Sequence, residues 1–158
     1  MGLVFVDCEA WGGCPAVGQL TEFGAVCYDT RDTFHGVLAV SEQRTKPTFA
    51  KEYDVFSEFT AWLNALNQHG RPIFVSDNVA FDWQWINDGF WRTLGKNPFG
   101  HSGRRIGDFA AGLAGDFTAT QAWKQLRVTK HDHNPVNDAM GNVEAFAQLI
   151  ARSKELRP

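Results

Sequence analysis

Two carboxylates, Asp7 and Glu9, stand one residue apart at the end of the apolar run that spans residues 3–6. A short, continuous apolar run is typical of a strand buried on both faces, and its period of two places Asp7 and Glu9 on the same side. Each buried carboxylate loses its hydration and repels its neighbour, and a divalent cation would relieve both effects. The pair therefore indicates either a metal site or a solvated strand end that carries two surface acids.

A third carboxylate, Asp82, follows another buried strand. Residues 73–75 form a second continuous apolar run, which predicts an interior strand parallel to the first, and residues 83–94 are typical of a helix. Asp82 is therefore expected in the first turn after the carboxyl end of a strand. Open α/β sheets hold their binding sites at this position.

A fourth carboxylate, Asp138, is expected in the first turn of a long helix from about residue 136 to residue 156. Asn134 suits the N-cap of that helix, and Pro135 suits its first helical position. His133 then stands before the helix, five residues ahead of Asp138. Taken alone, an acid in a first turn is better explained by its interaction with the helix dipole, which contributes ~0.3–1 kcal/mol.

The remaining patterns predict an α/β fold. Residues 20–28 and 33–40 are typical of two strands joined by turn residues, so the first three strands would form an antiparallel meander. Helical spacing of apolar residues follows Asp54, a suitable N-cap, and the Gly-Arg-Pro sequence at residues 70–72 ends that helix. We therefore expect a mixed central sheet, an antiparallel three-stranded meander plus parallel strands, flanked by helices.

The length and composition favour one ordinary globular domain that spans residues 1–158. Of these residues 44% are apolar and 21% are charged, as is usual for a chain that forms a core. Three cysteines, Cys8, Cys14 and Cys27, have no zinc-like spacing, and no signal peptide or long apolar run is present. We expect a cytoplasmic protein with reduced thiols and no membrane partner. Cys8 alternates away from the two acids of the first strand, so it is expected in the core.

Charge is distributed unevenly along the chain, although the net charge is only -3. Acidic residues outnumber Lys and Arg in residues 1–60, whereas Lys and Arg outnumber acids in residues 92–130. The basic part includes residues 118–127, for which we predict a small helix capped by Thr118 or Thr120. An acidic half beside a basic half suits a polyanionic substrate, but a solvated helical face would give the same pattern.

Three motifs, in this order, resemble those of the DEDDh exonucleases. They are residues 7–12 (DCEAWG), residues 78–82 (NVAFD) and residues 133–139 (HNPVNDA). Residues 20–26 (LTEFGAV) look like the second strand of that family, so the resemblance covers nearly the whole chain. The family includes proofreading subunits of replicative polymerases, RNase T, oligoribonuclease and small bacterial exoribonucleases. The resemblance implies a ribonuclease H-like fold and 3′-to-5′ hydrolysis of single-stranded RNA or DNA, with release of 5′-mononucleotides.

The resemblance also implies two divalent metal ions, Mg²⁺ or Mn²⁺. Asp7 would bridge the two ions, and Glu9 and Asp138 would complete the protein ligands of the catalytic ion. Asp82 would serve the second ion. Hard oxygen ligands favour these ions over zinc, and an ion pair of this kind assists both the attacking and the leaving oxygen of a phosphodiester.

His133 is the general base that the resemblance implies, because an imidazole with a pKa near ~6.5 can accept a proton at neutral pH. His131 is the rival candidate, but its spacing to the last motif acid does not match the family. Three further acids lie near the motifs: Asp77, Asp108 and Asp132. We expect these three to support neighbouring residues and not to bind the metal.

Five residues are candidates for substrate binding. Trp11 stands within the first motif, two residues after Glu9, and is expected on a loop that its glycines make flexible, where its ring could stack on a terminal base or only pack against the protein. Ala10 stands where related enzymes often have a hydroxyl residue. Asn78 could fix the loop before the second motif or touch the terminal nucleotide. Arg104 and Arg105 are the most concentrated basic pair and are expected to follow upstream phosphates.

The expected partner is the 3′ end of a single-stranded nucleic acid, and the resemblance to RNase T and oligoribonuclease also implies a homodimer. No motif distinguishes RNA from DNA, because that choice depends on a contact to one 2′-hydroxyl. Two other functions stay open at this point. One is a nucleic-acid-binding module that has lost the chemistry, and the other is a phosphohydrolase of nucleotides or small phosphoesters.

Overall fold

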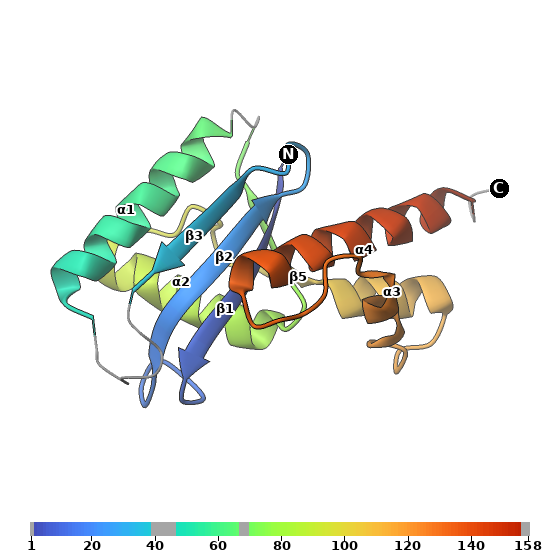
Figure 1. Ribbon diagram of the computed structural model, residues 1–158, viewed down its shortest axis with the longest axis horizontal. Helices are drawn as coiled ribbons and strands as arrows, with labels where there is room; N and C mark the ends of the chain where they lie inside the picture. The colour runs from blue at the N-terminus through green and yellow to red at the C-terminus, as the bar shows by residue number, and fades with distance from the viewer. Residues whose placement is uncertain (1, 39–46, 67–69, 156–158) are drawn as a thin grey trace.

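The computed structural model describes residues 2–38, 47–66 and 70–155, and in them a five-stranded sheet lies between helices (Figure 1). The strands are β1 (Leu3–Trp11), β2 (Gln19–Cys27), β3 (Thr33–Val37), β4 (Ile73–Ser76) and β5 (Gly103–Arg105). The helices are α1 (Phe49–Ala65), α2 (Val79–Leu94), α3 (Ile106–Ala114), the 3-10 helix η2 (Ala122–Leu126) and α4 (Pro135–Glu155). None of these helices is both long enough and apolar enough to span a lipid bilayer.

The sheet has the strand order β3-β2-β1-β4-β5, with β1 in the centre. β1 pairs antiparallel with β2, and β2 pairs antiparallel with β3, as the predicted meander requires. On its other side β1 pairs parallel with β4, which pairs parallel with β5. The predicted α/β class with a mixed sheet is therefore confirmed, and the strand that carries the first motif is its middle strand.

Side chains of β1 alternate between two hydrophobic cores, one on each face of the sheet. Val6 and Cys8 pack in the core formed with α1 and α2, so the expectation that Cys8 is buried is confirmed. Phe5 packs in the core formed with α3, η2 and α4. Because strand residues alternate between faces, Asp7 and Glu9 follow Phe5 onto the face that α4 covers.

Helix α1 begins earlier than its apolar pattern predicts. Thr48 is the N-cap, and its hydroxyl accepts a hydrogen bond from the Lys51 amide at 3.2 Å. The predicted cap, Asp54, lies inside the helix, because the first turn and a half is mostly exposed and shows no apolar periodicity. The helix also ends at Ala65, before the predicted Gly-Arg-Pro stop, while residues 67–69 lie outside the described part of the chain.

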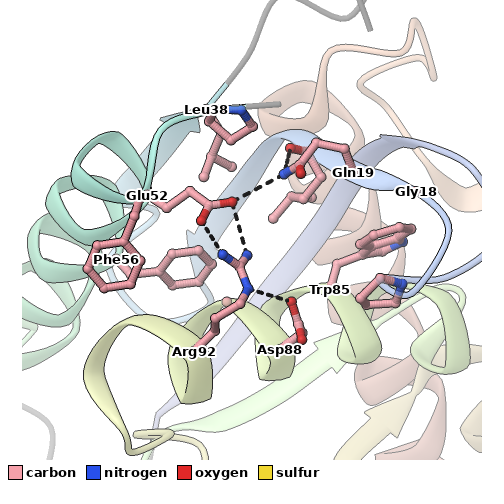
Figure 2. A pocket seen from close by; sticks show the side chains of 13 residues that line it. Gly18, Gln19, Leu38, Glu52, Phe56, Trp85, Asp88 and Arg92 are labelled. Atoms are coloured by element: carbon pink, nitrogen blue, oxygen red, sulfur yellow. Dashed lines mark hydrogen bonds and ion pairs between the residues drawn. The ribbon is translucent and has the colours of Figure 1, made fainter. Parts of the chain in front are cut away.

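A buried carboxylate fixes α1 against α2. Both Arg92 terminal nitrogens contact the Glu52 carboxylate, with Nη2 donating to Oε1 at 3.0 Å, and Glu52 itself is 3% exposed. Gln19 Nε2 donates to the same Oε1 at 3.3 Å, and Arg92 Nε donates to Asp88 at 3.2 Å beside a cavity of about 310 Å³ (Figure 2). Arg92 is thus neutralised within the fold and is not a free cation for a polyanion.

The small helix was also predicted with wrong limits. It is a 3-10 helix, η2, and Gln121, without a side-chain capping bond, occupies its N-cap position. Thr118 caps nothing, because its amide and its hydroxyl both donate to Asp116 Oδ1, at 2.9 and 2.7 Å. The short strand β5 precedes α3 and was not predicted, since three residues are too few to show a period.

The two helices that carry motif acids lie close to their predicted places. α2 begins at Val79, earlier than predicted, and Asp82 still falls in its first turn. α4 begins at Pro135, and Asn134 Oδ1 accepts hydrogen bonds from the amides of Val136 and Asn137 at 3.0 and 3.2 Å. The predicted cap of α4 is confirmed. Its predicted last residue, 156, lies outside the described part of the chain.

Candidate functional site

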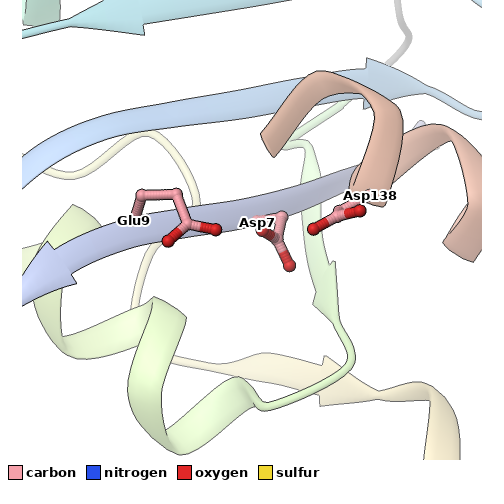
Figure 3. A group of neighbouring side chains, drawn as sticks. All are labelled: Asp7, Glu9 and Asp138. Carbon is pink, nitrogen blue, oxygen red and sulfur yellow. The ribbon is translucent and has the colours of Figure 1, made fainter. Parts of the chain in front are cut away.

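Three of the motif acids meet on one face of the sheet. Asp7 and Glu9 project from the same side of β1, and Asp138 reaches them from the first turn of α4 (Figure 3). One carboxylate oxygen from each residue lies within 4.8 Å of the others. This spacing is compatible with three oxygen ligands on one cation, which binds such ligands at about 2.0–2.6 Å.

A glycine in β2 allows α4 to approach β1 so closely. Gly24 is the register partner of Asp7, and a Cβ atom at Gly24 would overlap the backbone of Pro135 and Val136. The N-terminus of α4 therefore rests directly on β2, next to Asp7. As a result, Asp138 in the first turn of α4 lies beside the middle strand.

Asp82 comes to the same region from α2 and lies outside the group of three. It is 3% exposed, and its Oδ1 accepts a hydrogen bond from the Cys8 amide at 3.1 Å. That amide lies between Asp7 and Glu9 along β1, so the Asp82 carboxylate is bonded to the strand between the two residues that carry the other acids. Its negative charge also acts on Asp7 and raises the pKa of that carboxyl.

The cluster holds more negative charge than its surroundings neutralise. Burial, together with the nearby charges of Asp82, Asp138 and Glu9, raises the pKa of Asp7 to about 9, against a lowering effect of Arg127. Burial also raises the pKa of Asp82 to about 7, opposed by hydrogen bonds to that carboxylate. Each acid would regain its ordinary ionised form beside a bound cation.

The donor atoms favour a hard divalent ion. Every side chain of the cluster offers a carboxylate oxygen, which Mg²⁺ and Mn²⁺ prefer as a ligand. The one thiol nearby, that of Cys8, points to the other face of the sheet, where it donates to the Asp82 carbonyl with 3.7 Å between sulfur and oxygen. The residues present therefore fit the implied ions, and the set of ligands is unlike a zinc site.

Two histidines stand over the acids. His131 Nδ1 lies 2.6 Å from Asp138 Oδ2, and His133 Nδ1 lies 3.7 Å from Glu9 Oε1. The two rings are 4.5 Å apart between centroids, and the His133 side chain is 77% exposed. His131 is thus engaged with a candidate metal ligand, whereas the His133 ring remains accessible at the mouth of the site.

The loop that carries these histidines is fixed at both ends to α4. Glu144 of α4 accepts hydrogen bonds from the amides of Val128 and Thr129 at 3.0 and 2.7 Å, and from the Thr129 hydroxyl at 3.0 Å. At the other end the Asp132 amide donates to Asp138 Oδ1 at 3.1 Å. These bonds hold His133, whose φ of 62° lies in the left-handed region that non-glycine residues rarely adopt.

A cavity of about 190 Å³ opens beside the acids. Trp11 lines it as the last residue of β1, which differs from the expected place in a flexible loop, and Ala10 lines it too. Among the described residues, its lining consists of Glu9, Ala10, Trp11, Thr21, Glu22 and His133. Two of the five predicted substrate-binding residues are therefore next to the carboxylate cluster.

The other three predicted substrate-binding residues do not line this cavity. Asn78 is an exposed residue at the start of α2, and its side chain makes no capping bond. Arg104 and Arg105 lie on β5, which β4 separates from β1. Arg105 donates from Nε to the Asp77 carbonyl at 3.2 Å and from Nη1 to Asp108 at 3.1 Å. Asp108 thus supports a basic residue and stays away from the cluster.

One basic residue near the cluster, Arg127, was not predicted as a site residue from the sequence. Arg127 is 12% exposed in its side chain, and Nη2 lies 3.3 Å from Asp77 and 2.5 Å from Asn142 Oδ1. Lys124 Nζ also contacts Asp77, at 2.7 Å. The only sequence signal for this network is Asn142, which follows Asp138 by four residues and so shares its face of α4.

The comparisons with known proteins agree with these motifs. The chain is 31% identical over 108 residues to the 3′-5′ DNA exonuclease Cap18 of Escherichia coli, a match that covers 65% of this chain and 57% of that protein. No family model matches the chain. The chain thus spans little more than half the length of its curated relative.

Two solved structures share the fold. The cell-death related nuclease 4 (CRN-4) superposes with a TM-score of 0.71 at 14% identity, over 96% of this chain and 64% of that one. The nuclease domain of 3′hExo, a DEDDh family member bound to rAMP, superposes with a TM-score of 0.64 at 14% identity, over 98% of this chain and 92% of that one. The ribonuclease H-like fold and the resemblance to the DEDDh 3′-to-5′ exonucleases, first indicated by three short motifs, are therefore confirmed.

Proposed function

We propose that this chain is a metal-dependent 3′-to-5′ exonuclease that removes 5′-mononucleotides from single-stranded nucleic acid. The observation that carries this proposal is the convergence of Asp7, Glu9 and Asp138 within 4.8 Å, with Asp82 attached to the same strand. A cluster of partly buried acids is unfavourable without a cation. The order of the three motifs in this chain and its similarity to a 3′-5′ DNA exonuclease of E. coli support this choice over a binding module without chemistry.

The four acids have separate roles in this proposal. Asp7 lies between Glu9 and Asp138 (Figure 3) and would be the ligand shared by both cations. Glu9 and Asp138 would complete one site, and Asp82 would serve the other. Two divalent ions, Mg²⁺ or Mn²⁺, would supply electrostatic stabilisation of the attacking and leaving oxygens of the phosphodiester. The protein holds the carboxylates in place through β1, Gly24 and the first turn of α4.

His133 is the proposed general base. Its side chain is mostly exposed and lies beside Glu9, so it can take a proton from an incoming water molecule and release it to solvent. His131 instead contacts Asp138 and is proposed to orient that carboxylate. The bonds that Glu144 accepts from the Thr129 amide and Asp138 accepts from the Asp132 amide restrict the loop, so the two imidazoles are held in different environments.

The cavity beside the cluster is the proposed site of the terminal nucleotide. Its volume of about 190 Å³ accommodates part of one nucleotide, and Trp11 offers an aromatic surface for an unpaired base. Stacking on an aromatic side chain contributes ~1–3 kcal/mol per base and requires no particular sequence. A base can stack in this way only when it is not paired, which favours a single-stranded 3′ end.

The direct test uses an oligonucleotide labelled at its 5′ end, incubated with the protein and Mn²⁺. The proposal expects a ladder that shortens from the 3′ end and mononucleotides as products, with slow reaction on a blunt duplex. Cleavage of a circular strand, or shortening from the 5′ end, contradicts it. Release of phosphate from free nucleotides without shortening of the oligonucleotide would instead support the phosphohydrolase alternative.

A further inference from the structure

A second glutamate lies directly opposite Glu9. Glu22 of β2 is the register partner of Glu9 of β1, just before the register shift between Glu9 and Ala10. Partners in an antiparallel pair project on the same face with Cβ atoms about 5 Å apart, and two like charges in this arrangement are destabilising. The repulsion between the two carboxylates has to be offset by neighbouring groups or by a bound ligand.

A histidine lies beside each of the two glutamates. His35 of β3 places Nε2 2.7 Å from Glu22 Oε2, and His133 lies near Glu9 at 3.7 Å. His35 thus contacts Glu22 from the neighbouring strand β3, whereas His133 lies near Glu9 from the loop before α4. The contact with His35 fixes the Glu22 carboxylate at one oxygen, and a carboxylate has further acceptor positions at the other.

Both glutamates line the cavity of about 190 Å³ beside the metal-ligand cluster. Thr21 lines it too, but its hydroxyl already donates to the Glu9 carbonyl at 2.8 Å. The cavity is therefore lined by Trp11 and by two neighbouring carboxylate acceptors, those of Glu9 and Glu22. A nucleotide whose 5′-phosphate lies at the cluster would place its sugar next to them.

The sugar of a nucleic acid can offer either one or two donors to such a pair. A 3′-terminal ribose carries two adjacent hydroxyl groups, whereas a terminal deoxyribose carries one. Two acceptors are satisfied only by the ribose, and an acceptor left without a donor weakens binding. Carboxylates bind adjacent ribose hydroxyls in other nucleotide sites for the same reason.

We propose that Glu22 determines sugar specificity by accepting a hydrogen bond from the 2′-hydroxyl of the terminal nucleotide, so that a ribose 3′ end is preferred. This inference rests on the proposed exonuclease function. Glu22 touches the substrate and no metal, while His35 positions its carboxylate. Similarity to a DNA exonuclease does not determine whether this chain prefers ribose or deoxyribose, because that preference depends on individual contacts to the 2′-hydroxyl.

Three oligonucleotides with the same DNA body test the proposal. Their 3′-terminal nucleotides carry ribose, deoxyribose or 2′-O-methylribose, and kcat and KM for release of that nucleotide are measured with Mn²⁺. The wild type should favour the ribose end over the other two about tenfold or more in kcat/KM, as a hydrogen bond to a charged acceptor predicts. Glu22→Ala should lower that preference to near one, by raising KM for the ribose end only.

Two further variants separate recognition from structure. Glu22→Gln keeps an acceptor without the charge and should retain part of the preference, whereas Glu58→Gln removes an exposed acid of α1 and should leave it unchanged. A wild type without sugar preference overturns the inference, and so does an equal loss on all three ends in Glu22→Ala. If the wild type releases nothing from any end, the proposed function fails first, and that result is distinct from either of these.

Discussion

At the carboxylate cluster, each ligand is unfavourable for folding and necessary for the proposed chemistry. Changing Asp7, Glu9, Asp82 or Asp138 to Ala should nearly abolish exonuclease activity, because each removes an oxygen ligand. Stability without metal should hold or rise, most for Asp7, since burial and like charge raise its pKa to about 9. A gain of about 1 kcal/mol corresponds to roughly 2–4 °C in Tm for a chain of this size. Thermal unfolding in EDTA and the labelled-oligonucleotide assay provide the two measurements, and a variant with wild-type turnover would contradict its ligand role.

The same raised pKa values predict how stability depends on pH. A carboxyl whose pKa is higher in the folded than in the unfolded state binds more protons when folded, so stability falls as pH rises through the interval between the two values. For Asp7 this interval runs from 3.8 to about 9, and for Asp82 from 3.8 to about 7. In EDTA, Tm should therefore decrease from pH 5 to pH 9. Saturating Mn²⁺ should oppose that decrease, and identical curves with and without the ion would be evidence against a metal site.

The two histidines should differ in their effect on turnover. His133→Ala should lower kcat by about 10²–10⁴, the usual contribution of a general base. His131→Ala should act mainly on the concentration of Mn²⁺ required for half-maximal activity, because His131 contacts Asp138. Titrating both variants with Mn²⁺ measures the two effects separately. Equal losses of kcat at saturating metal would remove the basis for choosing His133.

Between elements, the close contact of α4 with the sheet sets the position of Asp138. Gly24→Ala would force the N-terminus of α4 away from β2, because its Cβ would overlap the backbone of Pro135 and Val136. We expect a loss of about 1–3 kcal/mol in stability, the usual cost of overpacking, and a weaker affinity for Mn²⁺ by calorimetry. Gly112→Ala in α3 is the matched control, since nothing lies within 4 Å of its Cβ position. An unchanged affinity in the Gly24 variant would show that α4 can shift without moving Asp138.

Elements with continuous apolar runs or capping signals could be predicted from the sequence, and elements set by tertiary contacts could not. β1 begins with the apolar run of residues 3–6, β4 contains the apolar run of residues 73–75, and Asn134 with Pro135 marks the start of α4. The first turn of α1 is exposed, so it leaves no pattern in the sequence. Glu22 was missed for a similar reason, because only the register of β1 against β2 places it opposite Glu9. In the sequence Arg127 is only one of several basic residues between 92 and 130. Its role is set by tertiary contacts with Asp77 and Asn142.

For the whole molecule, assembly into a homodimer stays a prediction, as does the single-domain organisation. The resemblance to RNase T and oligoribonuclease motivates the dimer, and the cavity of only about 190 Å³ offers little binding surface that a second subunit would extend. Light scattering at micromolar concentration should give twice the mass of the 17.7 kDa chain. A monomeric mass together with full exonuclease activity would rule the dimer out as a requirement.

The attachment of the histidine loop to α4 has a consequence for thermal motion. Glu144 and Asp138 are both residues of α4, and their side chains accept bonds from Thr129 and from Asp132, which lie on either side of His131, with Asp132 directly before His133. When α4 fluctuates against the sheet, loop and helix are therefore displaced together as one rigid piece. The distance between the proposed base, His133, and the candidate ligand Asp138 would then stay constant. The distance that would vary is the one between Asp138 and the two acids of β1. A bound cation would restrain that distance and so reduce the motion of the histidine loop and α4 together.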